Sequence, residues 1–207
     1  MRNGFTYLFI RNSTLSGNVE KKVFSPRFEA NPTDVTLVKS IAGLLSSNGC
    51  VDTELFLNSV VKLHELEPSF SSARLLYQLH SSKDQNEEAL AYLQQAIDNE
   101  ESNATDDAAM LLEMATFQFK KMNQYGKAVQ KAKEAIEKDA SVAGKANLLI
   151  GTIWYQVKCG GNEMEQRAKF WVATDYLQKA KNADPALAAE ADELIRTCRV
   201  YFPTTED

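Results

Sequence analysis

One short phrase recurs four times along the chain, and this recurrence constrains the fold more than any other feature. The four copies begin at residues 63, 96, 135 and 180 and read LHELEPS, AIDNEES, AIEKDAS and AKNADPA. Successive copies are therefore 33, 39 and 45 residues apart. Self-similarity at a spacing of about 20 to 50 residues is typical of architectures in which each repeat stacks on its neighbours. We expect the chain to form such an array.

Each phrase has the composition of a helix end. A small or apolar residue is followed by polar residues, an acidic residue and then proline or a substitute for it, and Pro68 and Pro185 are the clearest stops because proline cannot continue a helix. Two helix-length stretches with apolar residues at helical spacing precede each phrase. In the second copy these residues are Leu75, Leu76 and Leu79, then Ala89, Leu90, Leu93, Ala96 and Ile97. Each repeat is therefore predicted to be a helical hairpin.

A small residue recurs at one position of each second helix. The copies are Ala89 with Leu93, Ala128 with Ala132 and Ala173 with Leu177, preceded by a degenerate copy, Phe56 with Val60. Alanine at such a position allows paired helices to approach closely. In the first helix of the last copy, Gly151 likewise stands one turn before Trp154, and the weaker counterparts of this pattern are Tyr77 before His80 and Thr116 before Phe119.

These residues resemble the tetratricopeptide repeat. The resemblance covers about residues 33 to 200. It implies an all-α fold, a right-handed α-solenoid of stacked antiparallel helix pairs. Two features depart from the family pattern: no copy has the family's tryptophan in the first helix, and Phe56 replaces the small residue of the first copy.

Residues 159–203 resemble, more narrowly, the closing segment of a group of tetratricopeptide proteins found in Bacteroidetes. Members of that group usually begin with an export signal and additional repeats, so the resemblance implies the C-terminal part of a longer exported protein. The first 14 residues offer one short apolar run and no cleavage site, which is too little for a signal peptide. We therefore expect a periplasmic or cell-envelope location for a fragment of an exported parent, and a cytoplasmic one otherwise.

The sequence divides into three parts. Residues 1–32, with an aromatic cluster of Phe5, Tyr7 and Phe9, are expected to form an N-terminal helical cap or remnant repeat. Residues 33–200 are expected to hold about four hairpins and a capping helix, and residues 201–207 a tail. We expect the first clear helix to run from about Asp34 to Ser47 with Thr33 as its N-cap, and the next to start at an Asp52 cap and end near Leu66.

Composition excludes several classes of partner. The net charge is -5 and the pI is about 5.2, whereas nucleic acids and anionic membranes require clustered Lys and Arg. The most apolar window, residues 146–157, is much shorter than the roughly 20 residues that cross a bilayer. We expect neither nucleic-acid binding nor membrane insertion.

Motifs for catalysis or cofactor binding are scarce. Cys50, Cys159 and Cys198 form an odd set without C-x-x-C spacing, which favours small hydrophobic residues over a metal or redox site. His64 and His80 fall in different repeats without triad spacing and are interpreted as structural. Phosphate-loop and zinc-protease motifs do not occur. We expect a non-enzyme without catalytic residue, cofactor or metal, and an enzyme built on His80 or Cys159 is the less favoured alternative.

The expected site is the concave surface lined by the first helix of each pair. Its mixed polar and aromatic character suits an extended peptide, and it lacks the Lys and Asn set with which chaperone-binding members of the family hold a terminal carboxylate. The expected function is a non-catalytic scaffold for an unidentified protein or peptide partner. The alternative is a structural spacer or self-association module, a homo-oligomer contact of a longer cell-envelope protein. The residues expected to be exposed in the groove are Arg74, Gln78, Glu113, Phe117, Lys120, Lys145, Thr152 and Tyr155.

Overall fold

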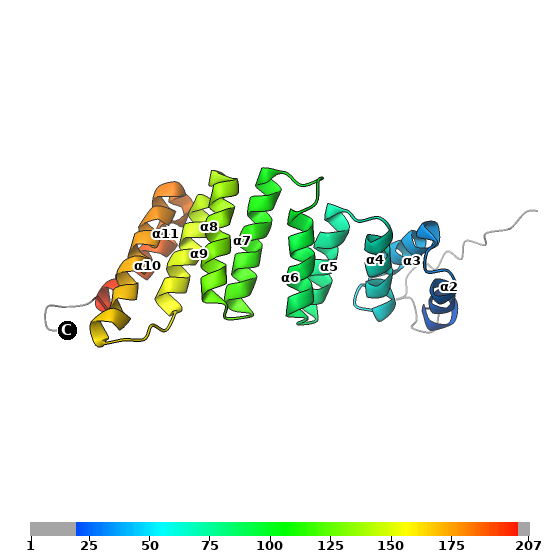
Figure 1. Ribbon diagram of the computed structural model, residues 1–207, viewed down its shortest axis with the longest axis horizontal. Helices are drawn as coiled ribbons and strands as arrows, with labels where there is room; N and C mark the ends of the chain where they lie inside the picture. The colour runs from blue at the N-terminus through cyan, green and yellow to red at the C-terminus, as the bar shows by residue number, and fades with distance from the viewer. Residues whose placement is uncertain (1–19, 203–207) are drawn as a thin grey trace, which may run out of the picture.

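The computed structural model describes residues 20–202, and this part of the chain is helical without a strand (Figure 1). The expected cluster of Phe5, Tyr7 and Phe9 and the tail beyond Phe202 lie outside the described residues. The elements are η1 (Glu20–Phe24), α2 (Ser25–Ala30), α3 (Val35–Ser47), α4 (Glu54–Leu66), α5 (Phe70–Ser82), α6 (Asn86–Ile97), α7 (Ala104–Lys120), α8 (Tyr125–Lys138), η2 (Ala140–Val142), α9 (Ala143–Gln156), α10 (Glu163–Ala183), η3 (Pro185–Leu187) and α11 (Ala188–Val200).

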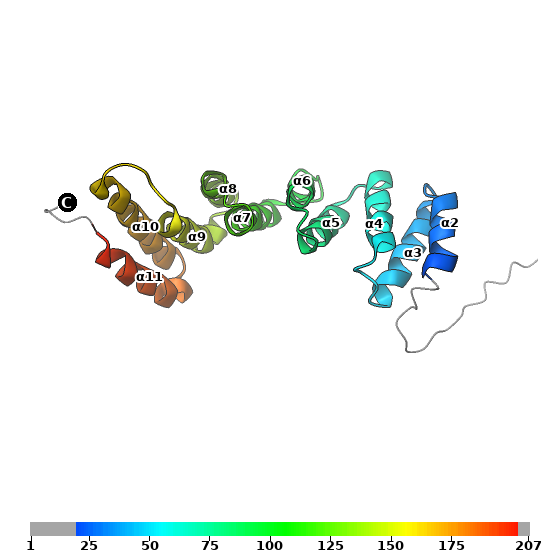
Figure 2. The same ribbon diagram turned by 90° about the horizontal axis from the view of Figure 1, so that it is seen from below.

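The helices form successive antiparallel pairs. The pairs are α3 with α4, α5 with α6, α7 with α8 and α9 with α10, and α11 then packs on α10. Figure 2 shows a shallow arch in which α5, α7 and α9 lie on one side and α6, α8 and α10 on the other, while α3 and α11 bend toward the first side. The first helices therefore line the concave face. The predicted all-α solenoid of helix pairs is confirmed.

Side-chain caps set several of the helix starts. The Asp34 carboxylate accepts a hydrogen bond from the Leu37 backbone N–H at 3.0 Å, and the Thr53 hydroxyl accepts one from Phe56 N–H at 3.2 Å. Both caps have extended backbone dihedrals, which an N-cap residue requires. The predicted caps at Thr33 and Asp52 were therefore each wrong by one residue, although both helices end where expected.

The fourth pair is built around a long second helix. Asn162 starts α10 with a capping box, in which its side chain accepts from Glu165 N–H while the Glu165 carboxylate accepts from Asn162 N–H, both at 2.9 Å. The helix then runs 21 residues. The predicted break at residues 159–162 and the longer second helix are confirmed.

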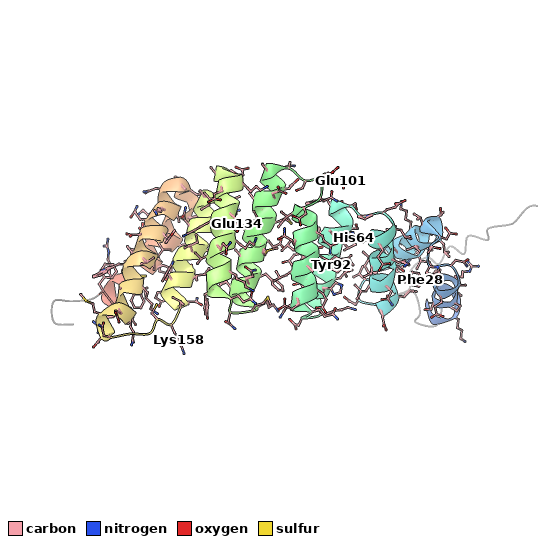
Figure 3. The ribbon with its side chains drawn as sticks, viewed as in Figure 1. Phe28, His64, Tyr92, Glu101, Glu134 and Lys158 are labelled. Carbon is pink, nitrogen blue, oxygen red and sulfur yellow. The ribbon has the colours of Figure 1, made fainter. Side chains whose placement is uncertain are left out.

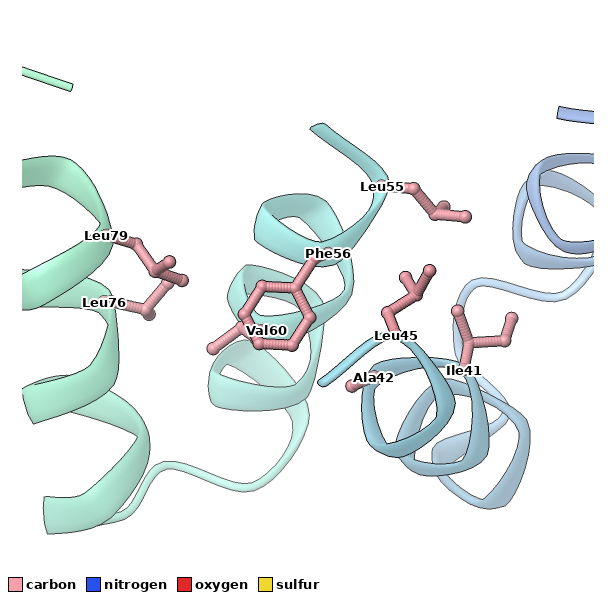
Figure 4. Packing of buried hydrophobic residues seen from close by; sticks show 8 residues of the cluster. All are labelled: Ile41, Ala42, Leu45, Leu55, Phe56, Val60, Leu76 and Leu79. Atoms are coloured by element: carbon pink, nitrogen blue, oxygen red, sulfur yellow. The ribbon is translucent and has the colours of Figure 1, made fainter. Parts of the chain in front are cut away.

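The core follows the small residues of the second helices. Ala89, Ala128 and Ala173 are fully buried where each second helix meets its partner. In the first pair Phe56 takes this position and is only 3 % exposed. Figure 4 shows its ring between α3 and α5, among Ile41, Ala42, Leu45, Leu55, Val60, Leu76 and Leu79.

Within the described residues, no helix has the length and apolar character needed to cross a membrane.

Candidate binding surface on the concave face

Most of the predicted groove residues do lie at the surface of the first helices. Arg74 and Gln78 of α5, Lys120 of α7 and Lys145 of α9 are exposed. None of these four side chains makes a hydrogen bond or ion pair to another described residue. The partly exposed members of the set are Glu113, Thr152 and Tyr155.

The expectation of an exposed Phe117 was wrong. This ring is 6 % exposed and packs against Tyr77 with the ring centres 5.9 Å apart and the planes at 68°. Tyr77 stands in α5 where α9 has Gly151, so a large side chain from α5 reaches toward α7. Met110 and Met114 of α7 complete the apolar cluster. Phe117 therefore belongs to the packing between the second and third pairs.

Arg74 and Glu113 are the two predicted residues whose charges lie near the Tyr77 hydroxyl. Burial, followed by the charge of Glu113, raises the pKa of Tyr77 well above its ordinary value, and Arg74 opposes the shift. The phenol therefore stays neutral beside the Glu113 carboxylate.

The other predicted residues lie apart from this cluster. Lys120 is the last residue of α7, whereas Lys145 lies in the first turn of α9. Because the first helices run in the same direction, these cations sit at opposite edges of the concave face. The Thr152 hydroxyl donates to the Leu148 carbonyl at 2.9 Å. The candidate surface is thus a wide polar band and not a compact pocket.

An aromatic cluster at the C-terminal end of the band was missed by sequence reasoning. The Tyr155 ring lies 5.9 Å from Phe170 of α10, which in turn stacks on Tyr201 at 5.0 Å. Trp171 meets Phe202 nearby, with 6.2 Å between ring centres. When the phrase at residue 180 is aligned with the phrase at residue 135, the position equivalent to Tyr155 is adjacent to Tyr201. This alignment could have revealed the cluster from the sequence.

Two hollows lie on the opposite, convex side, for which no site was predicted. One of about 440 Å³ separates α6 from α8, with Ile97 and Leu111 among its lining residues. Another of about 480 Å³ runs along α8. Both include Glu134, which Figure 3 labels on α8. A hydrogen bond from Lys131 Nζ, 2.7 Å long, lowers the pKa of this carboxyl, so the charge of Glu134 is already paired.

The histidines are part of the packing between the first two pairs. His64 Nδ1 lies 2.7 Å from Ser72 Oγ, and His64 Nε2 lies 2.8 Å from Gln95 Oε1. The Tyr92 ring stacks on His80 at 5.1 Å and meets His64 edge-on at 5.7 Å (Figure 3). Across residues 20–202, no cluster of three or more His, Cys, Asp or Glu side chains is arranged to hold a metal ion.

The cysteines are free thiols. Cys198 is fully buried against α10, and burial raises the pKa of its thiol. A raised pKa keeps the nucleophilic thiolate scarce. Cys50 and Cys159 are partly buried.

Comparison with solved structures identifies the architecture. The chain superposes on a crystal structure of MamA protein with a TM-score of 0.55 and 18 % identity, over 80 % of this chain and 81 % of that one. It matches YrrB, described as a TPR protein with an unusual peptide-binding site, with a TM-score of 0.55 and 18 % identity, over 87 % of this chain and 84 % of that one. The chain has the tetratricopeptide-repeat fold. No family model matches its sequence, and no curated protein does.

Proposed function

We propose that the protein is a non-catalytic interaction scaffold that binds an extended segment of a protein partner across its concave face. The observation that carries this proposal is the set of unpaired polar side chains on α5, α7 and α9. Some lysines elsewhere are held in ion pairs, such as Lys121 with Asp84 and Lys138 with Asp107, whereas Lys127 and Lys133 of α8 make none within the described part of the chain. On the concave face Arg74, Lys120 and Lys145 make no ion pair with any described residue.

Unpaired donors on a rigid surface suit an extended peptide. A peptide backbone presents carbonyl acceptors at regular intervals, and a preformed helical surface loses little conformational freedom when it binds them. The contacts proposed are Arg74, Gln78, Glu113, Lys120, Lys145, Thr152 and Tyr155. Tyr155 offers the aromatic contact, because Phe117 is buried. YrrB, which shares this fold and is described as having an unusual peptide-binding site, adds support.

Catalysis is the less favoured interpretation of this protein. The two residues on which an active site could have been built were His80 and Cys159. His80 is buried beneath Tyr92 and hydrogen-bonded through Nδ1 to Gln85, and the hollows on the convex side contain neither residue. The similarity of residues 159–203 to Bacteroidetes proteins adds a cell-envelope setting to the scaffold proposal.

A peptide selection tests the proposal. Binders are selected from a random displayed peptide library against the full chain, and their Kd is then measured for two double variants. Arg74→Glu with Lys145→Glu reverses two concave charges and is expected to weaken binding by about tenfold or more, a loss of about 1.4 kcal/mol. Lys127→Glu with Lys133→Glu makes the same charge change on α8 and is expected to leave Kd unchanged. Equal losses in both variants would refute concave binding.

A further inference from the structure

The large apolar side chains that remain exposed are confined to the two ends of the array. At the N-terminal end they are Val23, Leu44 and Val51, and at the C-terminal end Met164, Trp171, Val200 and Tyr201. In the described chain between residues 52 and 163, no large apolar side chain is exposed. The interior of the solenoid is therefore closed, whereas its ends keep apolar surface in contact with solvent.

At the C-terminal end, α11 is placed like a first helix that has no second helix among the described residues. The turn that precedes it repeats the turn before α9: the Asp184 carboxylate accepts from Ala186 N–H at 3.0 Å, as Asp139 does from Ser141 N–H at 2.8 Å. The buried stripe of α11 also repeats that of α9, with Ala191, Ile195 and Cys198 spaced like Ala146, Ile150 and Ile153.

The position where a second helix would pack on α11 is open. In the fourth pair, Gly151 of α9 lies against Ala173 and Leu177 of α10. The residue of α11 equivalent to Gly151 is Arg196, which is exposed. Val200, one turn later on the same side of α11, is 77 % exposed.

At the N-terminal end, α2 is placed like a second helix that has no first helix among the described residues. It packs on α3 at the position where α4 packs on α5 and α8 on α9, although this contact is smaller than either of those. Phe24 and Phe28 contribute its inward face to the core of the first pair. The outward side of η1 and α2, formed by Val23, Pro26 and Ala30, is exposed, and α2 contains no buried residue.

We propose that the two ends are complementary halves of one helix pair, and that copies of this chain associate head to tail through them. In the junction, α11 of one copy supplies the first helix and η1–α2 of the next copy supplies the second. The contact continues the interface between successive pairs that the interior already uses. Such an interface is heterologous, because it joins two different surfaces, and it propagates into short linear chains.

Charge and shape at the two ends agree with this arrangement. The outward side of α11 carries Glu193 and Arg196, and α2 carries Arg27 and Glu29, all exposed and without an ion pair to another described residue. Each end thus offers one charge of each sign to the other. A large residue at the Arg196 position is compatible with a helix pair, because Tyr77 occupies the equivalent position of α5 and packs against Ala89 and Leu93. This inference does not require the concave face to bind a partner.

Sedimentation of the full chain at increasing concentration tests the proposal. The weight-average mass of the wild type is expected to rise by about twofold or more between micromolar and millimolar concentration, because each junction adds one copy. Val23→Glu blocks the N-terminal end, and Val200→Glu blocks the C-terminal end; each is expected to remain monomeric. Ala91→Glu adds the same charge to an exposed position in the middle of the array and is expected to associate like the wild type.

Mixing the two end variants separates head-to-tail association from other modes. Each variant keeps one functional end, so a mixture is expected to form dimers with one copy of each and to stop there. Association by either variant alone, absence of mixed dimers, or a wild type that stays monomeric would each overturn the proposal. The last outcome would show that another segment covers the ends. Circular dichroism confirms folding, and peptide binding to the concave face should be the same in both variants.

Discussion

At the level of single side chains, Tyr77 joins the first helices of two neighbouring pairs. Its ring packs on Phe117 of α7, and its hydroxyl lies near the Glu113 carboxylate, one turn earlier on the same helix. The second and third pairs are therefore held together here by an aromatic contact beside a charged group.

Replacing Tyr77 by phenylalanine should make stability less dependent on pH. Because the pKa of Tyr77 is raised on folding, its contribution is fully present below the unfolded-state pKa of about 10 and is lost as pH rises above it. At pH 7, Tyr77→Phe removes the polar contact between the hydroxyl and Glu113 and should lower the free energy of unfolding by about 1 kcal/mol or less. Urea denaturation at pH 7 and near pH 11 measures both effects.

The difference in unfolding free energy between wild type and Tyr77→Phe reports on Tyr77 alone, because all other ionising groups are common to both proteins. Burial also raises the pKa of Tyr92, but that residue is present in both proteins. The difference in unfolding free energy between wild type and Tyr77→Phe should become smaller at high pH. A difference in unfolding free energy that is the same at both pH values would contradict a raised pKa for the buried Tyr77.

The burial of Phe117 could not be predicted from the sequence. Its spacing placed it one turn from Glu113 on α7, and it was therefore expected to be exposed in the groove. Whether such a side chain is exposed depends on its neighbour across the helix–helix contact. For Phe117 that neighbour is Tyr77, which occupies the position that Gly151 has in α9. Periodicity within one helix contains no information about this distance between helices.

At the level of helices, side-chain size sets how closely the two members of a pair approach. A Cβ added to Gly151 would lie 2.7 Å from Leu177 Cγ and 3.1 Å from the Ala173 carbonyl oxygen. These distances are shorter than ordinary van der Waals contact, so α9 and α10 approach as closely as they do only because residue 151 lacks a side chain. Gly43, within α3, has no neighbouring atom within 4 Å of the same position.

The two glycines should therefore respond oppositely to alanine. Gly43→Ala places a better helix former in open space and should raise the free energy of unfolding by about 0.5 to 1 kcal/mol. Gly151→Ala gains the same propensity but forces α9 and α10 apart, and a net loss of about 1 to 2 kcal/mol is expected. Urea denaturation of both variants checks the prediction, and stabilisation by Gly151→Ala would show that the pair can relax without cost.

Helix limits were more accessible from the sequence than helix caps. The ends at Ser47 and Leu66 follow from Gly49 and Pro68, because these residues stop a helix wherever it lies. Caps depend on which residue takes an extended backbone, and adjacent polar residues such as Thr33 and Asp34 compete for that role. The α6 and α8 starts, at Gln85 and Gln124, have no side-chain cap hydrogen bond at all.

At the level of the whole molecule, each pair touches only its neighbours, so stability depends on the contacts between successive pairs. Period and helix pattern were enough to predict this architecture. The exposed ends and the convex hollows were not predictable, because they depend on how whole pairs are placed relative to one another. In the middle of the array, Ile150 of α9 packs with Ala115 of α7 and Ala132 of α8.

Truncating Ile150 should uncouple the fourth pair and α11 from the three pairs before them. This side chain is fully buried, so Ile150→Ala should lower the free energy of unfolding by about 2 to 5 kcal/mol and weaken the contact between the third and fourth pairs.

The two tryptophans, Trp154 and Trp171, lie in the C-terminal part of the chain, so their fluorescence follows the unfolding of that part, whereas circular dichroism follows every helix. In the wild type the two urea transitions should coincide. In Ile150→Ala the fluorescence transition should move to lower urea than the dichroism transition, because a one-dimensional array separates where its interface is weakest. An equal shift of both probes would instead mean that the pairs unfold as one unit, with coupling strong enough to survive the loss of this contact.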